Sequence, residues 1–387
     1  MSSPSSKMEV VETEPDSAAS SDSFAAPLSA AAARRSRSDS VSDDYATVKT
    51  NDEATEAKVG AVRLGYWSDP FVVCFVYSSS ERQAPHRDPE INRGYWARVA
   101  AFGALIDKFI NACAQAGQPC QIVNLGSGFD TLYWRLAERQ LIGDSKVRTF
   151  VDVDFSTVTS KKIHHIRRAG NRRLLDALQQ GEAPPSAGVE PPSPQPGSLS
   201  PAVREGGGHA DLHASHYHLL GADLRQPSEL QAKLDSVPTL SSEAPTLVLA
   251  ECVLVYMSSG SSGRLLQLLS KRFQKACFLN YEQVNLNDNF GAVMEKNLYS
   301  RGLSLPGMEP CQTIQSQENR FTQNGWPHAR VLTCQEIYQN HLPIPPFYRI
   351  ERIQPLDEKE LLQQLLEHYC VAVAANDRSL FEQVPFD

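Results

Sequence analysis

The stretch QIVNLGSGFD, residues 121–130, decides the fold prediction for this chain. Its first five residues predict a buried β-strand. The turn Gly126-Ser127-Gly128 follows, and a helical pattern begins near Thr131. Two glycines let the backbone turn sharply and let a ligand approach it closely, while the start of a helix offers free amide donors. The stretch therefore predicts a strand–turn–helix unit with a ligand site at its turn.

Strands and helices alternate through the rest of the chain. Seven segments are predicted as strands, at 121–125, 148–154, 216–222, 246–251, 276–281, 329–332 and 369–374. Helical patterns lie between them at 131–140, 157–179, 227–235 and 263–273. This alternation is typical of an α/β fold, a doubly wound, mostly parallel seven-stranded sheet with helices on both faces. Such sheets bind ligands at the carboxyl ends of their strands.

Acidic side chains stand at the ends of three further predicted strands, at Asp154, Asp223 and Glu251. A carboxylate there can accept hydrogen bonds from ribose hydroxyls. A dinucleotide would favour a third glycine in the turn, but Thr131 takes that position. S-adenosylmethionine carries no phosphate and fits the shorter turn. Asp223 would then accept from the adenine amino group, and Leu224 would flank the ring.

Composition and charge exclude several classes of protein. The net charge of −8 gives no basic footprint, so no nucleic-acid partner is expected. The sequence contains no run of about 18 apolar residues, so no membrane helix is predicted. The N-terminus also lacks an apolar signal segment. Eight cysteines form no Cys-x-x-Cys pair, which indicates free thiols in a reducing compartment. We therefore expect a cytoplasmic protein, with the nucleus as the alternative.

A metal site is not predicted. His213, His216 and His218 have a suggestive spacing, but no cysteine or carboxylate pair completes a ligand set.

Several longer segments are distinctive and occur in a fixed order. They are GYWSDP at 65–70, INRGYWARV at 91–99, residues 121–136, VDF at 153–155, ADLR at 222–225, AECVLVY at 250–256, NYEQ at 280–283 and NGW at 324–326. With these segments the chain closely resembles the leucine carboxyl methyltransferase family, over residues 58–375. The resemblance implies an S-adenosylmethionine-dependent methyltransferase with an added helical lid. Its implied substrate is the α-carboxylate of the C-terminal leucine of the type-2A protein phosphatase catalytic subunit.

The resemblance also implies site residues and a domain plan. The family's cofactor-binding residues match Lys58, Arg98, Gly126, Asp154, Asp223, Leu224 and Glu251. Residues 1–50, with thirteen serines, predict a disordered tail. Residues 51–387 form the methyltransferase domain, with a helical cap at 51–110, a Pro- and Gly-rich flexible insertion at 180–214 and a lid or substrate segment at 285–311. We expect a monomer.

The chemistry of the implied reaction needs no general base, because a carboxylate with a pKa near 3.5 is already ionised at pH 7. Charge disappears during methyl transfer, so neutral donors suit the substrate better than a cation. Tyr256 and Tyr281 are the candidates for orienting it. Three alternatives remain open: the related methyltransferases of wybutosine synthesis on transfer RNA, a small-molecule O-methyltransferase, and a catalytically silent module that docks on the phosphatase.

Overall fold

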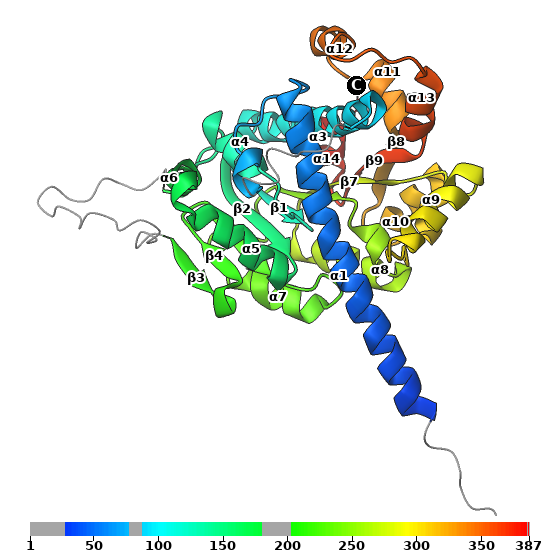
Figure 1. Cartoon of the computed structure of the whole chain (residues 1–387). Helices are drawn as coiled ribbons and strands as arrows, with labels where there is room; N and C mark the ends of the chain where they lie inside the picture. Colours follow the sequence, from blue (N-terminus) through cyan, green and yellow to red (C-terminus); the bar gives the residue numbers. More distant parts are fainter. Residues whose placement is uncertain (1–27, 77–86, 180–202, 385, 387) are drawn as a thin grey trace, which may run out of the picture. The chain divides into compact units, whose positions relative to one another are not determined.

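The computed structural model describes residues 28–76, 87–179, 203–384 and 386, and it describes their side chains from residue 44 onward except at 344 and 345. The chain divides into two units, Met1–Ser42 and Asp43–Asp387. Of the first unit the structure describes only the helical backbone from Leu28, which belongs to helix α1 (Leu28–Arg63). Figure 1 shows the helices and strands of the chain, and all contacts described below lie within the second unit.

One sheet of nine strands forms the centre of the second unit, in the order β3-β4-β5-β2-β1-β6-β7-β9-β8. Its strands are β1 (Cys120–Leu125), β2 (Val147–Asp154), β3 (Arg204–Gly206), β4 (Asp211–His213), β5 (Tyr217–Gly221), β6 (Thr246–Glu251), β7 (Ala276–Gln283), β8 (His328–Thr333) and β9 (Tyr369–Ala375). The five strands from β5 to β7 pair in parallel. Strand β9 is antiparallel to both β7 and β8, so β8 runs in the direction of the parallel strands.

The described helices connect and cover these strands. Besides α1 they are α3 (Pro89–Gln115), α4 (Leu132–Glu138), α5 (Ser156–Arg167), α6 (Arg172–Leu178), α7 (Pro227–Asp235), α8 (Ser259–Arg272), α9 (Asn289–Ser300), α10 (Ile314–Thr322), α11 (Cys334–Asn340), α12 (Ile344–Ile350), α13 (Lys359–Glu367) and α14 (Arg378–Gln383).

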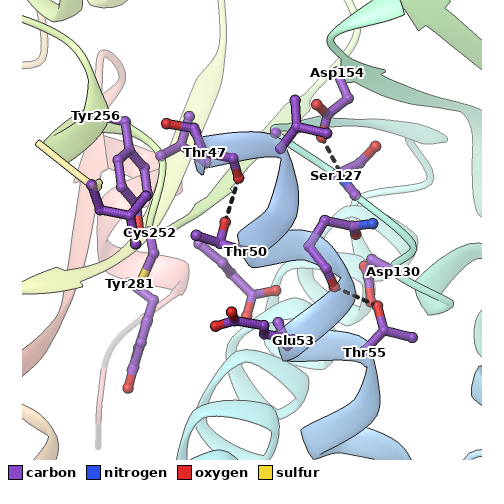
Figure 2. Close-up of a pocket in the computed structure, with 18 of the residues that line it drawn as sticks. Thr47, Thr50, Glu53, Thr55, Ser127, Asp130, Asp154, Cys252, Tyr256 and Tyr281 are labelled. Atoms are coloured by element: carbon purple, nitrogen blue, oxygen red, sulfur yellow. Dashed lines mark hydrogen bonds between the residues drawn. The ribbon is translucent and has the colours of Figure 1, made fainter. Parts of the chain in front are cut away.

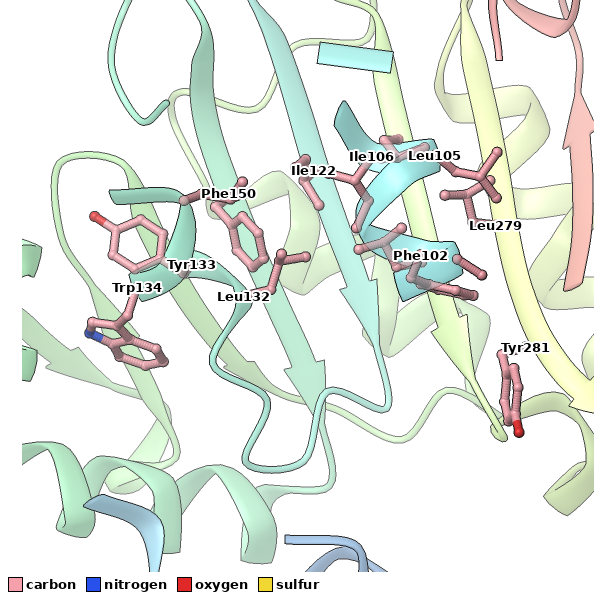
Figure 3. Packing of buried hydrophobic residues seen from close by; sticks show 14 of the residues in the cluster. Phe102, Leu105, Ile106, Ile122, Leu132, Tyr133, Trp134, Phe150, Leu279 and Tyr281 are labelled. Carbon is pink, nitrogen blue, oxygen red and sulfur yellow. The ribbon is translucent and has the colours of Figure 1, made fainter. Parts of the chain in front are cut away.

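Both faces of the sheet are covered, which explains why all six residues of β1 are buried. Ile122 packs on one face with residues of α3 and α4, as Figure 3 shows. Its neighbour Val123 packs on the other face with residues of α7 and α8. This doubly wound arrangement confirms the predicted fold class. Among the described residues, no helix is both long and apolar enough to cross a membrane.

Two predicted flexible segments are ordered in part. The seven predicted strands are present, but β3 and β4 form an additional hairpin at the edge of the sheet, inside the predicted insertion 180–214. Asp211 anchors this hairpin, since its carboxylate accepts from the Gly221 amide at 2.8 Å and from Lys233 Nζ at 2.5 Å. Residues 180–202 of the predicted insertion lie outside the described residues.

The prediction that residues 1–50 form a disordered tail is also wrong in part. Residues 1–27 lie outside the described residues, but α1 begins at Leu28, so the interval 28–50 is helical and not disordered. Composition could not reveal this, because the helix is held by contacts distant in sequence. The Asp44 carboxylate, for example, forms two hydrogen bonds to the Arg225 guanidinium.

The predicted helix 157–179 is interrupted. It is divided into α5 and α6 around Gly170, and the Asn171 side-chain amide donates to the carbonyl oxygen of His165 at 2.8 Å, near the end of α5.

Candidate active site

A cavity of about 500 Å³ lies at the carboxyl ends of β1, β2, β5 and β6. Its size is typical of a small-molecule site. All nine residues predicted from the sequence line it together, and Figure 2 shows part of this lining. They are Lys58, Arg98, Gly126, Asp154, Asp223, Leu224, Glu251, Tyr256 and Tyr281.

The glycine-rich turn forms the floor at the end of β1. Gly126 and Gly128 both have positive φ, at +57° and +49°. A Cβ on Gly126 would lie 2.5 Å from Val253 Cγ2, and one on Gly128 would lie 2.4 Å from Asn51 Oδ1. At both positions glycine is required for two reasons: the backbone has a positive φ, and a Cβ atom would clash with a neighbouring side chain. The Ser127 hydroxyl, which sequence reasoning did not single out, is buried and without a protein partner in the described part of the chain.

Asp154 is held against this turn. Its Oδ2 accepts from the Gly128 amide and its Oδ1 from the Phe155 amide, both at 2.7 Å. Burial raises the pKa of Asp154 to about 6, although the two amides act to lower it. The turn and the end of β2 thus form one rigid unit with a fixed carboxylate facing the cavity.

Arg98 and Glu251 form an ion pair on the cavity wall. Burial acts to lower the pKa of Arg98, but the Glu251 carboxylate, together with Cys252, Tyr281 and Tyr95, raises it well above its ordinary value. The guanidinium carbon also lies 4.6 Å from the centre of the Tyr281 ring, within cation–π range. Nε and Nη2 bond to Glu251, so among the described residues Nη1 has no hydrogen-bond partner and can reach a ligand.

Lys58 reaches the site through Asp130, the residue that ends the turn. Lys58 Nζ lies 3.9 Å from Asp130 Oδ1. Burial acts to raise the pKa of Asp130, but Lys58 and other nearby cations lower it overall. Beneath the turn, the fully buried Lys162 donates to Asp130 O at 3.0 Å and to Asp152 Oδ2 at 2.7 Å.

Asp223 is oriented by a neighbouring arginine. The Arg225 backbone amide and Nε both donate to Asp223 Oδ1 at 2.9 Å. The same guanidinium pairs with Asp44 of α1 at 2.7 Å and stacks 5.4 Å from the Phe155 ring centre. One arginine therefore links α1 to the end of β5.

Helix α1 supplies lining residues that sequence reasoning missed. Figure 2 shows Thr47, Thr50, Glu53 and Thr55 on this helix. Asn51 accepts from the Phe129 amide at 2.8 Å and so closes the glycine-rich turn. The lining positions 44, 47, 48, 51, 54, 55 and 58 lie on one helical face, at spacings of three and four residues. Their side chains share no chemical character, so nothing in the sequence indicated that they form part of the site.

The other end of the cavity is apolar and aromatic. Tyr256 and Met294 pack against one small hydrophobic cluster, formed by Val255, Leu286 and Cys311. Further apolar and aromatic residues that line the cavity are Met257, Leu298, Leu303, Leu365, Leu366 and Tyr369. Burial raises the pKa of Tyr256 and of Tyr281, so both phenols stay protonated.

The described residues offer no metal centre. No group of three or more histidine, cysteine or acidic side chains in this part of the chain is placed to hold a metal ion. His213 and His218 pair with each other, with 3.1 Å between their Nδ1 atoms.

Comparison with known proteins identifies the family. The leucine carboxyl methyltransferase family model matches residues 7–270. Leucine carboxyl methyltransferase 1 of Caenorhabditis elegans is 44% identical over 357 residues, which cover 92% of this chain and 98% of that protein. The Bos taurus protein of the same name is 36% identical over 339 residues, which cover 87% of this chain and 92% of that protein. This chain belongs to the leucine carboxyl methyltransferase family.

As a member of this family, the chain is an S-adenosylmethionine-dependent methyltransferase. The cavity fits this cofactor, because carboxylates and an unpartnered hydroxyl surround a turn that lets a ligand approach its backbone closely.

Two more distant similarities complete the comparison. The human tRNA wybutosine-synthesizing protein 4 is 30% identical over 343 residues, which cover 88% of this chain but 46% of that protein. Among solved structures, a DUF574 family protein from Streptomyces avermitilis covers 83% of this chain and 97% of its own, with a TM-score of 0.43 and 12% identity. Nothing about function follows from a structural likeness at that level.

Proposed function

We propose that this chain methyl-esterifies the α-carboxylate of the C-terminal leucine of the type-2A protein phosphatase catalytic subunit. The observation that carries the proposal is the division of one cavity into a polar end and an apolar end. Asp154, Glu251 and the glycine-rich turn stand at strand ends, whereas the apolar lining residues Met294, Leu298 and Leu303 lie on α9 or just after it. A leucine side chain fits the apolar end while its carboxylate faces the cofactor.

The polar end holds the cofactor in this proposal. Asp154 accepts from the ribose hydroxyls, and Gly126 allows the close approach of the ligand. Asp223 accepts from the adenine amino group, with Leu224 against the ring. Lys58 is a cation on the same wall, suited to the methionyl carboxylate.

Arg98 and Glu251 complete the methionyl end of the site. Arg98 Nη1 has no hydrogen-bond partner among the described residues and suits the methionyl carboxylate, as Lys58 does. Glu251 fixes the Arg98 guanidinium by its ion pair and is the carboxylate nearest to it, placed to accept from the methionyl amine.

When bound, S-adenosylmethionine supplies an electrophilic methyl group: a carboxylate oxygen forms the new C–O bond, the C–S bond breaks, the sulfur keeps the electron pair, and no proton moves. The protein therefore needs no general base. No histidine occurs among the described residues that line the cavity, and burial raises the pKa of the Cys252 thiol to about 12, which keeps it neutral. What the chain contributes is in-line positioning and exclusion of water.

The phosphatase contributes contacts beyond its last residue, because a short peptide tail alone would bind weakly. We further propose that the enzyme acts as a monomer in the cytoplasm or nucleus. The eight cysteines, all free in the structure and seven of them buried, support a reducing compartment.

Labelled methyl transfer tests the proposal. The protein is incubated with methyl-labelled S-adenosylmethionine and the purified phosphatase catalytic subunit, either complete or lacking its terminal leucine. Label is expected on the complete subunit, released by mild base as expected for an ester, and absent from the truncated one. Labelling of transfer RNA or of a free small carboxylic acid, with none on the phosphatase, would contradict the proposal.

A further inference from the structure

The tyrosine hydroxyls of this enzyme divide into two groups. The buried tyrosines outside the cavity each donate to a protein acceptor: Tyr66 to Gln354 at 2.9 Å, Tyr133 to the Ala177 carbonyl at 3.4 Å, Tyr217 to Asp152 at 2.7 Å and Tyr338 to Glu351 at 2.7 Å. This is the expected behaviour, because a buried phenol normally finds a partner.

The cavity tyrosines behave differently. Tyr95, Tyr256, Tyr281 and Tyr369 all line the cavity, and within the described part of the chain none of their hydroxyls has a hydrogen-bond partner. Burial raises the pKa of each of them, so each remains a neutral donor. Tyr281 is buried, whereas Tyr95, Tyr256 and Tyr369 are partly exposed, so these four hydroxyls are free to donate to a ligand that enters the cavity.

Two of these tyrosines form a pair. Strands β7 and β9 are antiparallel neighbours, and Tyr369 lies opposite Gln283. Tyr281 is two residues before Gln283, so Tyr281 and Tyr369 emerge from the same face of the sheet. Their rings stack with 5.2 Å between centres and 12° between planes. In Figure 3 the Tyr281 hydroxyl points away from the other labelled core residues.

The pair stands next to the methionyl end of the cofactor site. The Arg98 guanidinium lies over the Tyr281 ring, and Arg98 pairs with Glu251 at the end of β6. Glu251 and Tyr281 are also register partners on β6 and β7, and the amide of Cys252, the residue after Glu251, donates to the Tyr281 carbonyl oxygen at 2.7 Å. A group held by the two hydroxyls would therefore lie beside the place where the methyl group is transferred.

We infer that Tyr369 is a substrate-binding residue which, together with Tyr281, donates hydrogen bonds to the carboxylate that receives the methyl group. This inference rests on the proposed function. Two parallel phenols match the two oxygens of a carboxylate, and they fix which oxygen faces the cofactor. As neutral donors they oppose the loss of negative charge less than a lysine or arginine would.

Tyr369→Phe tests the inference, because it removes one oxygen and keeps the stacked ring. Loss of a hydrogen bond to a charged acceptor is expected to lower kcat/KM for the phosphatase subunit about 10-fold or more. The dissociation constant for S-adenosylmethionine, measured by calorimetry, should stay at the wild-type value. Tyr281→Phe should behave similarly, while the control Tyr338→Phe removes a hydroxyl outside the cavity and should leave kcat/KM unchanged.

The outcomes separate the two proposals. If the wild type labels the phosphatase and Tyr369→Phe labels it with unchanged kcat/KM, the two hydroxyls do not bind the substrate carboxylate. The proposed function then still stands. Weaker cofactor binding in Tyr369→Phe would also overturn the pair, because it would assign the hydroxyl to the cofactor. If the wild type does not label the phosphatase, the proposed function is wrong, and the role inferred for Tyr281 and Tyr369 is wrong as well. Equal melting temperatures for all variants exclude misfolding.

Discussion

Arg98 serves the site through its charge and through its fixed position on the cavity wall. It is held between Glu251 and the Tyr281 ring, so its guanidinium has little freedom to move. Substituting Arg98 has two separate effects: it removes the cation offered to a ligand, and it removes the charge that neutralises the partly buried Glu251 carboxylate.

Arg98→Ala is expected to weaken S-adenosylmethionine binding about 10-fold or more, because a charged hydrogen bond to the methionyl carboxylate is lost. It should also lower the melting temperature, since Glu251 is left unpaired. Arg98→Ala/Glu251→Gln should recover the melting temperature but not the affinity. Calorimetry and thermal unfolding measure the two effects. Wild-type affinity in Arg98→Ala would remove Arg98 from the cofactor site.

Asp154 gives cofactor binding a pH dependence. Its folded-state pKa, about 6, lies above the ordinary aspartate value. Ribose hydroxyls donate best to the ionised carboxylate, so S-adenosylmethionine affinity should rise as the pH increases through about 6 and then level off.

The stability of the ligand-free enzyme should change in the opposite direction. Because the pKa of Asp154 is raised, the folded state binds the proton more tightly than the unfolded state does. Protonation of Asp154 therefore adds to the free energy of unfolding at low pH, and this added stability is lost as the pH rises from about 4 to about 6. Asp154→Asn should abolish the pH dependence of S-adenosylmethionine affinity and that of stability, and it should remove most of the affinity for the cofactor. Calorimetry at a series of pH values checks this, and an affinity that does not change across that range would contradict it.

Helix α1 is the element that closes the cofactor site. It touches the glycine-rich turn through Asn51 and Lys58, the end of β5 through Asp44 and Arg225, and α9 through an ion pair between Glu53 and Arg301. Its contacts thus reach elements on different sides of the cavity. We therefore predict that cofactor release requires some of these contacts to break.

Asp44→Asn is expected to speed S-adenosylmethionine dissociation about fivefold, because a partly exposed ion pair contributes about 1 kcal/mol. Asp235→Asn is the matched control, since it breaks an ion pair with Arg272 away from the cavity and should leave the rate unchanged. Stopped-flow displacement of the bound cofactor measures both rates. Equal rates for the two variants would show that the α1 contact does not limit release.

The whole molecule depends on a buried ion pair below the site. Lys162 of α5 and Asp152 of β2 are both inaccessible to solvent, and Tyr217 of β5 and Asn124 of β1 also bond to Asp152. Three strands and one helix therefore meet at one carboxylate. Because Lys162 also bonds to the Asp130 carbonyl, stability and the position of the turn are linked.

Lys162→Met is expected to lower the free energy of unfolding by about 3–5 kcal/mol, because it leaves the Asp152 carboxylate buried and unpaired. Lys161→Met, on the exposed side of the same helix, should change it by less than about 0.5 kcal/mol. Denaturant unfolding measures both variants. A small loss in Lys162→Met would mean that the other partners of Asp152 suffice to stabilise it.

The sequence by itself determined seven of the nine strands, the glycine-rich turn and the carboxylates that line the cavity at the strand ends. These features follow from local patterns. A few neighbouring residues are enough to recognise a buried strand, a pair of glycines or a carboxylate at a strand end. The carboxyl ends of parallel strands meet at one edge of a sheet, so the sequence alone predicts that Asp154, Asp223 and Glu251 lie near one another.

Only the tertiary structure decided how the site is closed and which groups remain free to bind a ligand. The contact of Asp44 with Arg225 joins positions far apart in the chain, and composition near residue 44 favoured disorder. The free hydroxyl of Tyr369 has the same origin. A tyrosine in a sequence does not reveal its hydrogen-bond partner, because that partner is fixed by strands and helices that meet only after folding.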